Sequence, residues 1–143
     1  RQKMMAVTLG PEDLTRRMDE VFPQVSKGFV IEEVTRTGVR VRLVTTDEHL
    51  RPGGTISGPS MFALADVGVY LAILARLGPV TLAVTTSSSM DFMRKPEAGR
   101  DLIADVTLLK LGRILAVGDV LIRSEGREEV VARATMTYSI PPR

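Results

Sequence analysis

The stretch from Gly58 to Leu77 is apolar on every side of a helical wheel, and helix start and stop signals flank it. Pro59 suits the first turn of a helix, where its missing N–H has no intrahelical acceptor. Gly78 and Pro79 indicate the end, because glycine favours a C-terminal cap and proline cannot continue a helix. An all-apolar helix either spans a membrane or forms the centre of a globular core. This one carries a carboxylate at its middle and has fewer than the roughly 20 apolar residues that a bilayer requires. We therefore expect a core helix surrounded by a larger element.

That carboxylate belongs to Asp66, whose neighbours on the same helix face are Phe62, Ala63, Val69 and Tyr70. An ionised carboxylate in such surroundings is costly unless it is paired or its pKa rises. Two interpretations follow. Asp66 is either a core residue bonded to a strand hydroxyl or a backbone N–H, or a catalytic base or nucleophile. We favour the second.

Composition narrows the class of protein. A chain of 143 residues supports one domain, here residues 1–143, with a substantial core. Lys and Arg number 19 against 17 Asp and Glu, Trp is absent, and Phe and Tyr are few, so a nucleic-acid partner is not expected. The absence of Cys excludes disulfides and thiolate metal sites. The N-terminal apolar run is too short for a signal peptide, so we expect a cytoplasmic protein that is not bound to membrane.

The rest of the chain is mostly β-rich. A short amphipathic helix is predicted over residues 11–22, before Pro23. Two strands follow, and a Gly- and Pro-rich loop over residues 47–58 leads into the core helix. After Pro79, four strands in a meander are expected, giving an antiparallel sheet of about six strands curled around the helix, an α+β fold. The strands are predicted over residues 29–35, 39–43, 80–93, 102–108, 114–124 and 130–138.

Three motifs carry a resemblance to a known family. They are RPGGTISGPSMFALAD over Arg51 to Asp66, FMRKPEAG over Phe92 to Gly99, and LLKLGRILAVGDV over Leu108 to Val120. Together they resemble the PaaI-type acyl-CoA thioesterases of the hotdog superfamily, over about residues 25–140. The resemblance implies the hotdog fold, an obligate homodimer that is often a dimer of dimers, and a substrate that is a CoA thioester of an aryl- or medium-chain acyl group.

The resemblance also suggests site residues. It places the catalytic acid at Asp66 and the oxyanion-hole amide at Gly58. A hydroxyl that supports the attacking water would fall at Thr85 or Thr86; the run from residue 85 to 89 could equally be an ordinary β-strand. The site also includes Ser57, which stands where the family has His.

Two further departures are Arg51 for the family's Asn and Pro59 for its second Gly. Pro59 is compatible with the helix start, whereas Ser57 and Arg51 change side chains that shape the loop and the water site. Arg94, Lys95 and Arg100 are candidates for contacts with the CoA phosphates, against the alternative of a solvated rim.

Thioester hydrolysis requires a donor for the developing oxyanion and a group that attacks the carbonyl carbon. The Gly58 N–H at a helix N-terminus suits the first role, and Asp66 suits the second as general base or nucleophile. No metal or bound cofactor is needed. Because Gly58 and Asp66 are eight residues apart, about 12 Å along a helix axis, we expect a site shared between two chains. The alternative function is a non-hydrolytic acyl-CoA or acyl-ligand binding protein.

Overall fold

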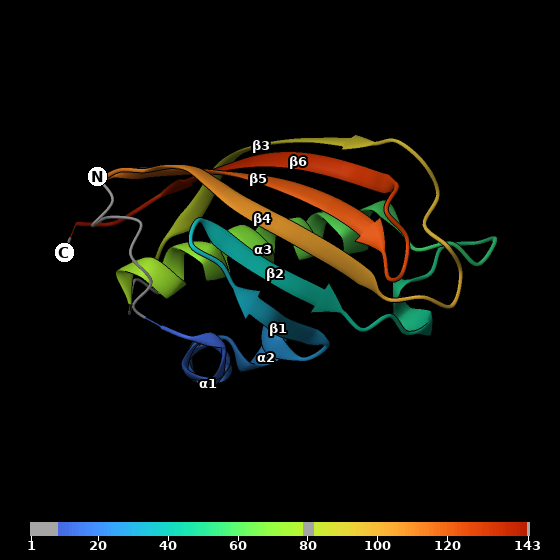
Figure 1. Cartoon of the computed structure of the whole chain (residues 1–143), viewed down its shortest axis with the longest axis horizontal. Helices are drawn as coiled ribbons and strands as arrows, with labels where there is room; N and C mark the ends of the chain where they lie inside the picture. Colours follow the sequence, from blue (N-terminus) through green and yellow to red (C-terminus); the bar gives the residue numbers. More distant parts are fainter. Residues whose placement is uncertain (1–8, 79–81, 143) are drawn as a thin grey trace.

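A curved antiparallel sheet of six strands surrounds one long helix in the computed structural model, which describes residues 9–78 and 82–142 (Figure 1). This is the predicted arrangement of a helix within a curled sheet. Pro79 and the first two residues of the strand predicted over 80–93 lie outside the described residues. The elements in chain order are α1 (Pro11–Val21), α2 (Pro23–Ser26), β1 (Phe29–Val34), β2 (Gly38–Leu43), the 3-10 turn η2 (Asp47–His49), α3 (Gly58–Leu77), β3 (Val84–Phe92), β4 (Leu102–Leu111), β5 (Leu115–Ser124) and β6 (Val130–Ser139).

The strand order is β1-β2-β4-β5-β6-β3, so the predicted four-strand meander is wrong for β3. Strand β3 pairs with β6 at the far edge of the sheet, and only β4, β5 and β6 form a meander. Short turns force neighbours in sequence to pair, as between β4 and β5. The longer segment over residues 93–101 allows the chain to cross, and the N–H groups of Met93 and Arg94 both donate to the Val131 carbonyl on the way.

Helix α3 is the centre of the core. Leu64, Leu71 and Leu74 are fully buried, and each buried side chain of this size contributes about 1.5–3 kcal/mol. The helix lies close to the sheet at Gly118, where a Cβ would meet the Val69 methyl groups at 3.1 Å. By length and composition α3 could cross a membrane, contrary to our expectation, but 67% of its most apolar window is buried inside the fold.

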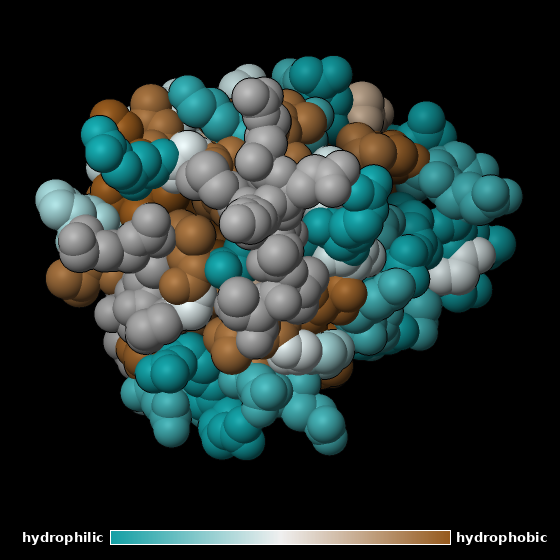
Figure 2. Space-filling view, turned by 60° about the vertical axis from the view of Figure 1, so that its left-hand side comes forward, coloured by the Kyte–Doolittle hydropathy of each residue, from teal (hydrophilic) through white to brown (hydrophobic). Residues whose placement is uncertain are grey.

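The N-terminal half of α3 is not covered on every side. Phe62 is 37% exposed and Ala63 is also exposed, while β3 beside this half of the molecule is exposed along most of its length. Strand β3 is a free edge of the sheet (Figure 1). Hydrophobic side chains also reach the surface at the end of the molecule that comes forward in Figure 2. An apolar helix face and an unpaired strand edge are thus both accessible.

The predicted helix over residues 11–22 is confirmed as α1, with one difference at its end. Leu14 and Met18 are buried against the core, as the apolar stripe indicates. The helix ends at Val21, and Phe22 has a non-helical backbone with φ −140° and ψ 51°. Pro23 explains the break, because the residue before a proline avoids the helical conformation. The short helix α2 then begins at Pro23.

Candidate active site

The Asp66 carboxylate accepts two hydrogen bonds on one oxygen. The Thr85 hydroxyl on β3 donates to Asp66 Oδ1 at 2.6 Å, and the Tyr138 hydroxyl on β6 lies 2.8 Å from the same atom. The Tyr138 hydroxyl is also 3.0 Å from the backbone carbonyl of Asp66. No group in the described part of the chain donates to Oδ2. The two hydroxyls therefore hold one side of a partly buried carboxylate and leave its other oxygen free to react.

The register of the sheet explains why these groups meet. Thr85 and Tyr138 are direct cross-strand partners in the antiparallel β3–β6 pair, so their side chains lie on one face, about 5 Å apart at Cβ. The Thr86 hydroxyl is exposed and lies 3.4 Å from the Thr137 carbonyl instead. Of the two candidate threonines, Thr85 is therefore the one whose hydroxyl reaches Asp66.

Tyr138 was not identified as a site residue from the sequence. The strand predicted over residues 130–138 alternates between an inner and an outer face. The other residues of its inner face are small or apolar, whereas Tyr138 carries a polar group. A buried tyrosine hydroxyl normally requires a partner, and this was the available signal. Burial raises the pKa of Tyr138, and the charge of Asp66 raises it further. The hydroxyl therefore remains protonated and able to donate.

Asp66 lies in the wall of a cavity of about 300 Å³. Most of the wall is apolar, and aromatic rings line part of it: Phe22 packs edge-on against Tyr70, with 5.8 Å between centroids, and Tyr70 lies 6.3 Å from Tyr138. Burial raises the pKa of Tyr70. A carboxylate in the wall of an apolar cavity suits a ligand in which the polar group that meets the carboxylate carries a hydrophobic substituent. The lining residues are Met18, Phe22, Ala63, Asp66, Val67, Tyr70, Thr85 and Tyr138.

Gly58 lies in a different cavity, of about 400 Å³, at the N-terminus of α3. It is the first residue of the helix, where backbone N–H groups have no intrahelical acceptor. The described residues provide no acceptor for the Gly58 N–H. The Phe92 ring covers this residue closely, since a Cβ added at Gly58 would lie 3.4 Å from Phe92 Cζ. The Gly58 amide is therefore a free donor beside an aromatic wall.

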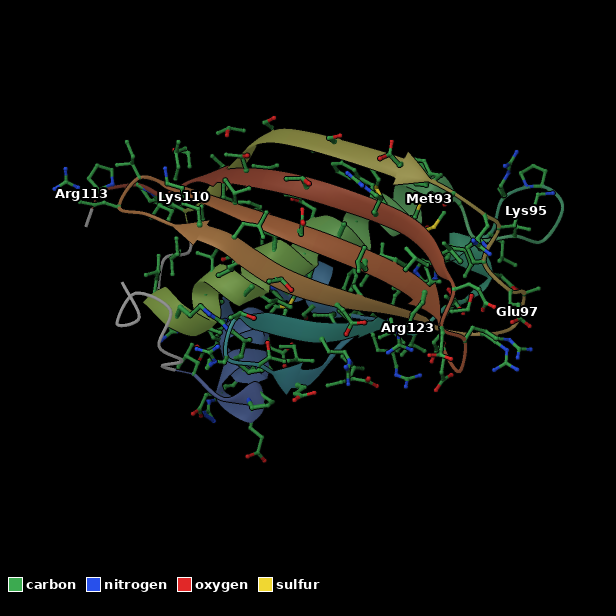
Figure 3. The ribbon with its side chains drawn as sticks, turned by 45° about the horizontal axis from the view of Figure 1, so that its top comes forward. Met93, Lys95, Glu97, Lys110, Arg113 and Arg123 are labelled. Atoms are coloured by element: carbon green, nitrogen blue, oxygen red, sulfur yellow. The ribbon has the colours of Figure 1, made fainter. Side chains whose placement is uncertain are left out.

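Three cations line the Gly58 cavity: Arg51, Arg94 and Lys95. In the part of the chain that the structure describes, none of them forms an ion pair. Figure 3 shows Met93 and Lys95 on the segment that follows β3, at the opposite end of the molecule from Arg113. Arg100 is not among the lining residues, because it donates to the Glu125 carbonyl at 3.0 Å and pairs with Glu97. Of the three cations predicted to contact the CoA phosphates, Arg94 and Lys95 therefore line the Gly58 cavity, and Arg51 lines it as well.

Ser57 is the N-cap of α3. Its hydroxyl accepts a hydrogen bond from the Ser60 N–H at 3.3 Å and lies 2.8 Å from the Ser60 hydroxyl. Its N–H donates to the His49 carbonyl, and the His49 ring accepts from the Thr46 N–H in a capping box of η2. These contacts give the Ser57 side chain and the His49 ring roles in local structure.

The Asp66 cavity and the Gly58 cavity have no lining residue in common. Gly58 and Asp66 are also eight residues apart on α3, about 12 Å along the helix axis, so one carbonyl group cannot lie within hydrogen-bond reach of both in the same chain. Over residues 9–78 and 82–142, no three side chains of His, Asp or Glu gather in a way that could hold a metal ion.

Comparison with known proteins identifies the family. Residues 53–131, more than half of the chain, match the family described as the Thioesterase superfamily. The chain belongs to this superfamily. Its curved sheet around a long helix is the hotdog fold, as the resemblance implies.

Solved structures agree with this thioesterase assignment. A provisionally named thioesterase from Silicibacter sp. TM1040 is 57% identical, with a TM-score of 0.91, over 97% of this chain and 96% of that one. A variant of the phenylacetic acid degradation protein PaaI from Thermus thermophilus is 30% identical, with a TM-score of 0.69, over 87% and 97% of the two chains. A hypothetical thioesterase from Streptococcus pneumoniae TIGR4, solved with coenzyme A, shares the fold at 24% identity and a TM-score of 0.72, over 92% and 97%.

Proposed function

We propose that this protein hydrolyses acyl-CoA thioesters, with Asp66 as the general base or nucleophile and the Gly58 N–H as the oxyanion donor. The observation that carries the proposal is the Asp66 carboxylate, held on Oδ1 by Thr85 and Tyr138 in the wall of an apolar cavity. The coenzyme A bound to the Streptococcus pneumoniae relative supports a CoA thioester as the substrate. An aryl- or medium-chain acyl group suits a cavity of this size and polarity.

Asp66 can act in either of two ways. As a base, it takes a proton from water while the water oxygen adds to the thioester carbonyl, and the tetrahedral intermediate then expels the CoA thiolate. As a nucleophile, Oδ2 adds to the carbonyl, the CoA thiolate leaves, and water hydrolyses the resulting anhydride. Because Thr85 donates its proton to Oδ1, its oxygen lone pairs are available to accept a hydrogen bond from that water. Tyr138 is a positioning residue in both schemes, whereas Thr85 both positions Asp66 and contacts the water.

The oxyanion requires a donor that is already in place when charge develops. The Gly58 N–H is the first amide of a 20-residue helix, whose N-terminus favours negative charge. One such donor is worth about 10²–10³ in kcat. The cations Arg51, Arg94 and Lys95 beside it would hold the phosphates of CoA, since guanidinium and ammonium groups bind phosphate oxygens strongly.

We infer that the site is shared by two chains of a homodimer. The Asp66 cavity and the Gly58 cavity are separate within one chain, and the β3 edge between them is free. Thr85 lies near one end of β3 and Phe92 at the other. Antiparallel pairing of two β3 edges about a two-fold axis would place the Thr85 end of each chain opposite the Phe92 end of its partner. Two equivalent sites would form, and the exposed face of α3 would be covered.

A second function, non-hydrolytic binding of an acyl-CoA, is favoured by one observation. Ser57 replaces the family's His, and its hydroxyl is engaged at the helix cap. A protein of this kind would bind acyl-CoA in the same cavities without turnover.

The test measures free thiol released from a panel of acyl-CoA substrates by the wild-type protein, Asp66→Asn and Gly58→Pro. Asn keeps the shape of Asp, and proline removes the N–H at a helix position that tolerates it. We expect each variant to lose about 10²-fold or more in kcat while thermal melting shows that it remains folded. A purified heterodimer of the two variants, selected with two different tags, should regain about half of the wild-type activity, because one site collects both changes.

An inactive heterodimer would contradict the shared site, and a fully active Asp66→Asn would contradict the mechanism. Binding of acyl-CoA by a wild-type protein that releases no thiol from any substrate would establish the second function.

A further inference from the structure

We propose that Met18 and Phe22, two side chains of the N-terminal segment, form the wall that limits the size of the acyl group accepted at Asp66. This inference rests on the proposed function, because it concerns the cavity in which the acyl group would lie. The two residues are the part of the lining that comes from the α1 segment; the remaining lining residues come from α3, β3 and β6.

The lining divides by chemistry as well as by position. Asp66, Thr85 and Tyr138 are joined by hydrogen bonds, so a change in any of them alters the reactive carboxylate. Met18 and Phe22 contribute apolar surface and have no hydrogen-bonding side-chain group toward that carboxylate. Substitutions at Met18 and Phe22 can therefore change the size of the cavity without removing the groups that hold Asp66. A surface that determines substrate specificity has this property.

The backbone fixes where this wall lies. Pro23 prevents Phe22 from continuing the helix, and Phe22 leaves it with φ −140° and ψ 51°. The Phe22 N–H still donates to the Met18 carbonyl at 2.8 Å, so the two residues stay one turn apart. Leu14, fully buried, anchors α1 in the core one turn earlier. Leu14 thus fixes the N-terminal side of this wall in the core, and the helix ends at its C-terminal side, before Phe22.

The two side chains have different mechanical properties. Phe22 is a rigid ring that packs edge-on against Tyr70, at 5.8 Å and 81°. Met18 is 3% exposed, and an unbranched thioether can adapt its shape to a ligand. Phe22 is therefore the stronger limit on size. At about 300 Å³ the cavity is at the lower end of the range for ligand sites, so removal of the ring would make a large relative difference.

The experiment compares acyl-chain-length profiles. We would measure kcat/KM for acetyl-, hexanoyl-, decanoyl- and tetradecanoyl-CoA with the wild type, Phe22→Ala, Phe22→Leu and Met18→Ala. Val21→Ala is the matched control, because Val21 is an adjacent, partly buried residue of the same helix that does not line the cavity. Thermal melting would show that each variant is folded.

Each methylene newly buried favours binding by roughly fourfold. For Phe22→Ala we therefore expect the ratio of kcat/KM for the longer to the shorter substrates to rise by about tenfold or more. Phe22→Leu and Met18→Ala should show smaller rises, and Val21→Ala should keep the wild-type profile. A Phe22→Ala profile that matches the wild type, or a Val21→Ala profile that shifts equally, would overturn the proposal.

A second measurement separates this inference from the proposed function. Non-hydrolysable S-alkyl-CoA thioethers of the same chain lengths would be titrated calorimetrically into each variant. If no variant releases thiol but Phe22→Ala gains affinity for the longer thioethers, the proposed hydrolysis is wrong and the proposed role of Phe22 in limiting chain length is supported. If thiol is released and neither assay shows a change in length preference, the function stands and the wall is wrong. A wild type that binds none of the thioethers overturns the proposal.

Discussion

Replacing Thr85 and Thr86 separately by valine provides the sharpest comparison of neighbouring residues in this protein. Valine keeps the branched shape of threonine and removes its hydroxyl. The Thr85 hydroxyl donates to the charged Asp66 carboxylate at 2.6 Å from a partly buried position. The Thr86 hydroxyl is exposed and contacts a neutral carbonyl at 3.4 Å. The two substitutions make the same chemical change, but only the one at residue 85 removes a hydrogen bond to Asp66.

The magnitudes follow from these contacts. A hydrogen bond to a charged group contributes about 1.5–3 kcal/mol, which corresponds to a loss of about 10- to 150-fold in kcat/KM if it is fully expressed in the transition state. Tyr138 still holds Oδ1 in Thr85→Val, so we expect the lower part of that range. A surface change such as Thr86→Val is usually worth no more than about 0.5 kcal/mol, or roughly twofold.

The assay is thiol release from the best acyl-CoA substrate of the wild-type protein, with melting temperatures measured in parallel. Thr85→Val should lose activity and melt a few degrees lower while remaining folded at the assay temperature, and Thr86→Val should resemble the wild type in both. Equal effects of the two substitutions, whether large or small, would refute the reasoning, because the Thr85 hydroxyl would then have no special relation to Asp66.

Two other predictions concern the neighbouring cavity. Ser57→Ala should lower the free energy of unfolding, measured by urea denaturation, by about 1 kcal/mol because the α3 cap is lost. It should reduce kcat far less than Asp66→Asn does. A loss of kcat as complete as that of Asp66→Asn would instead show a chemical role for Ser57. The double variant Arg94→Gln with Lys95→Gln should raise KM for an acyl-CoA more than for the matching acyl-pantetheine, which lacks the nucleotide phosphates. Arg113→Gln, at the opposite end of the molecule in Figure 3, is the control, and equal rises for both substrates would argue against phosphate contacts.

The sequence by itself determined the features that depend on local pattern. The apolar run from Gly58 to Leu77, its boundaries and the short helix before Pro23 could all be predicted, because periodicity, capping and proline geometry act over a few residues. Asp66 stood out for the same reason, as a charge within an apolar segment. The hydrogen bond to a strand hydroxyl, which the structural alternative for Asp66 describes, is present at Thr85. The catalytic role that we favour for Asp66 remains a prediction.

Only the tertiary structure decided which distant segments meet. Alternation in a strand shows that it has two faces, but not which strand lies beside it, so the pairing of β3 with β6 and the contact of Tyr138 with Asp66 could not be predicted. The same holds for Phe22, which reaches the Asp66 cavity, and for Arg100, which turns to Glu125 instead of Gly58. Such contacts depend on the crossing of long connections and on how the whole core packs, and neither is encoded in the pattern of neighbouring residues.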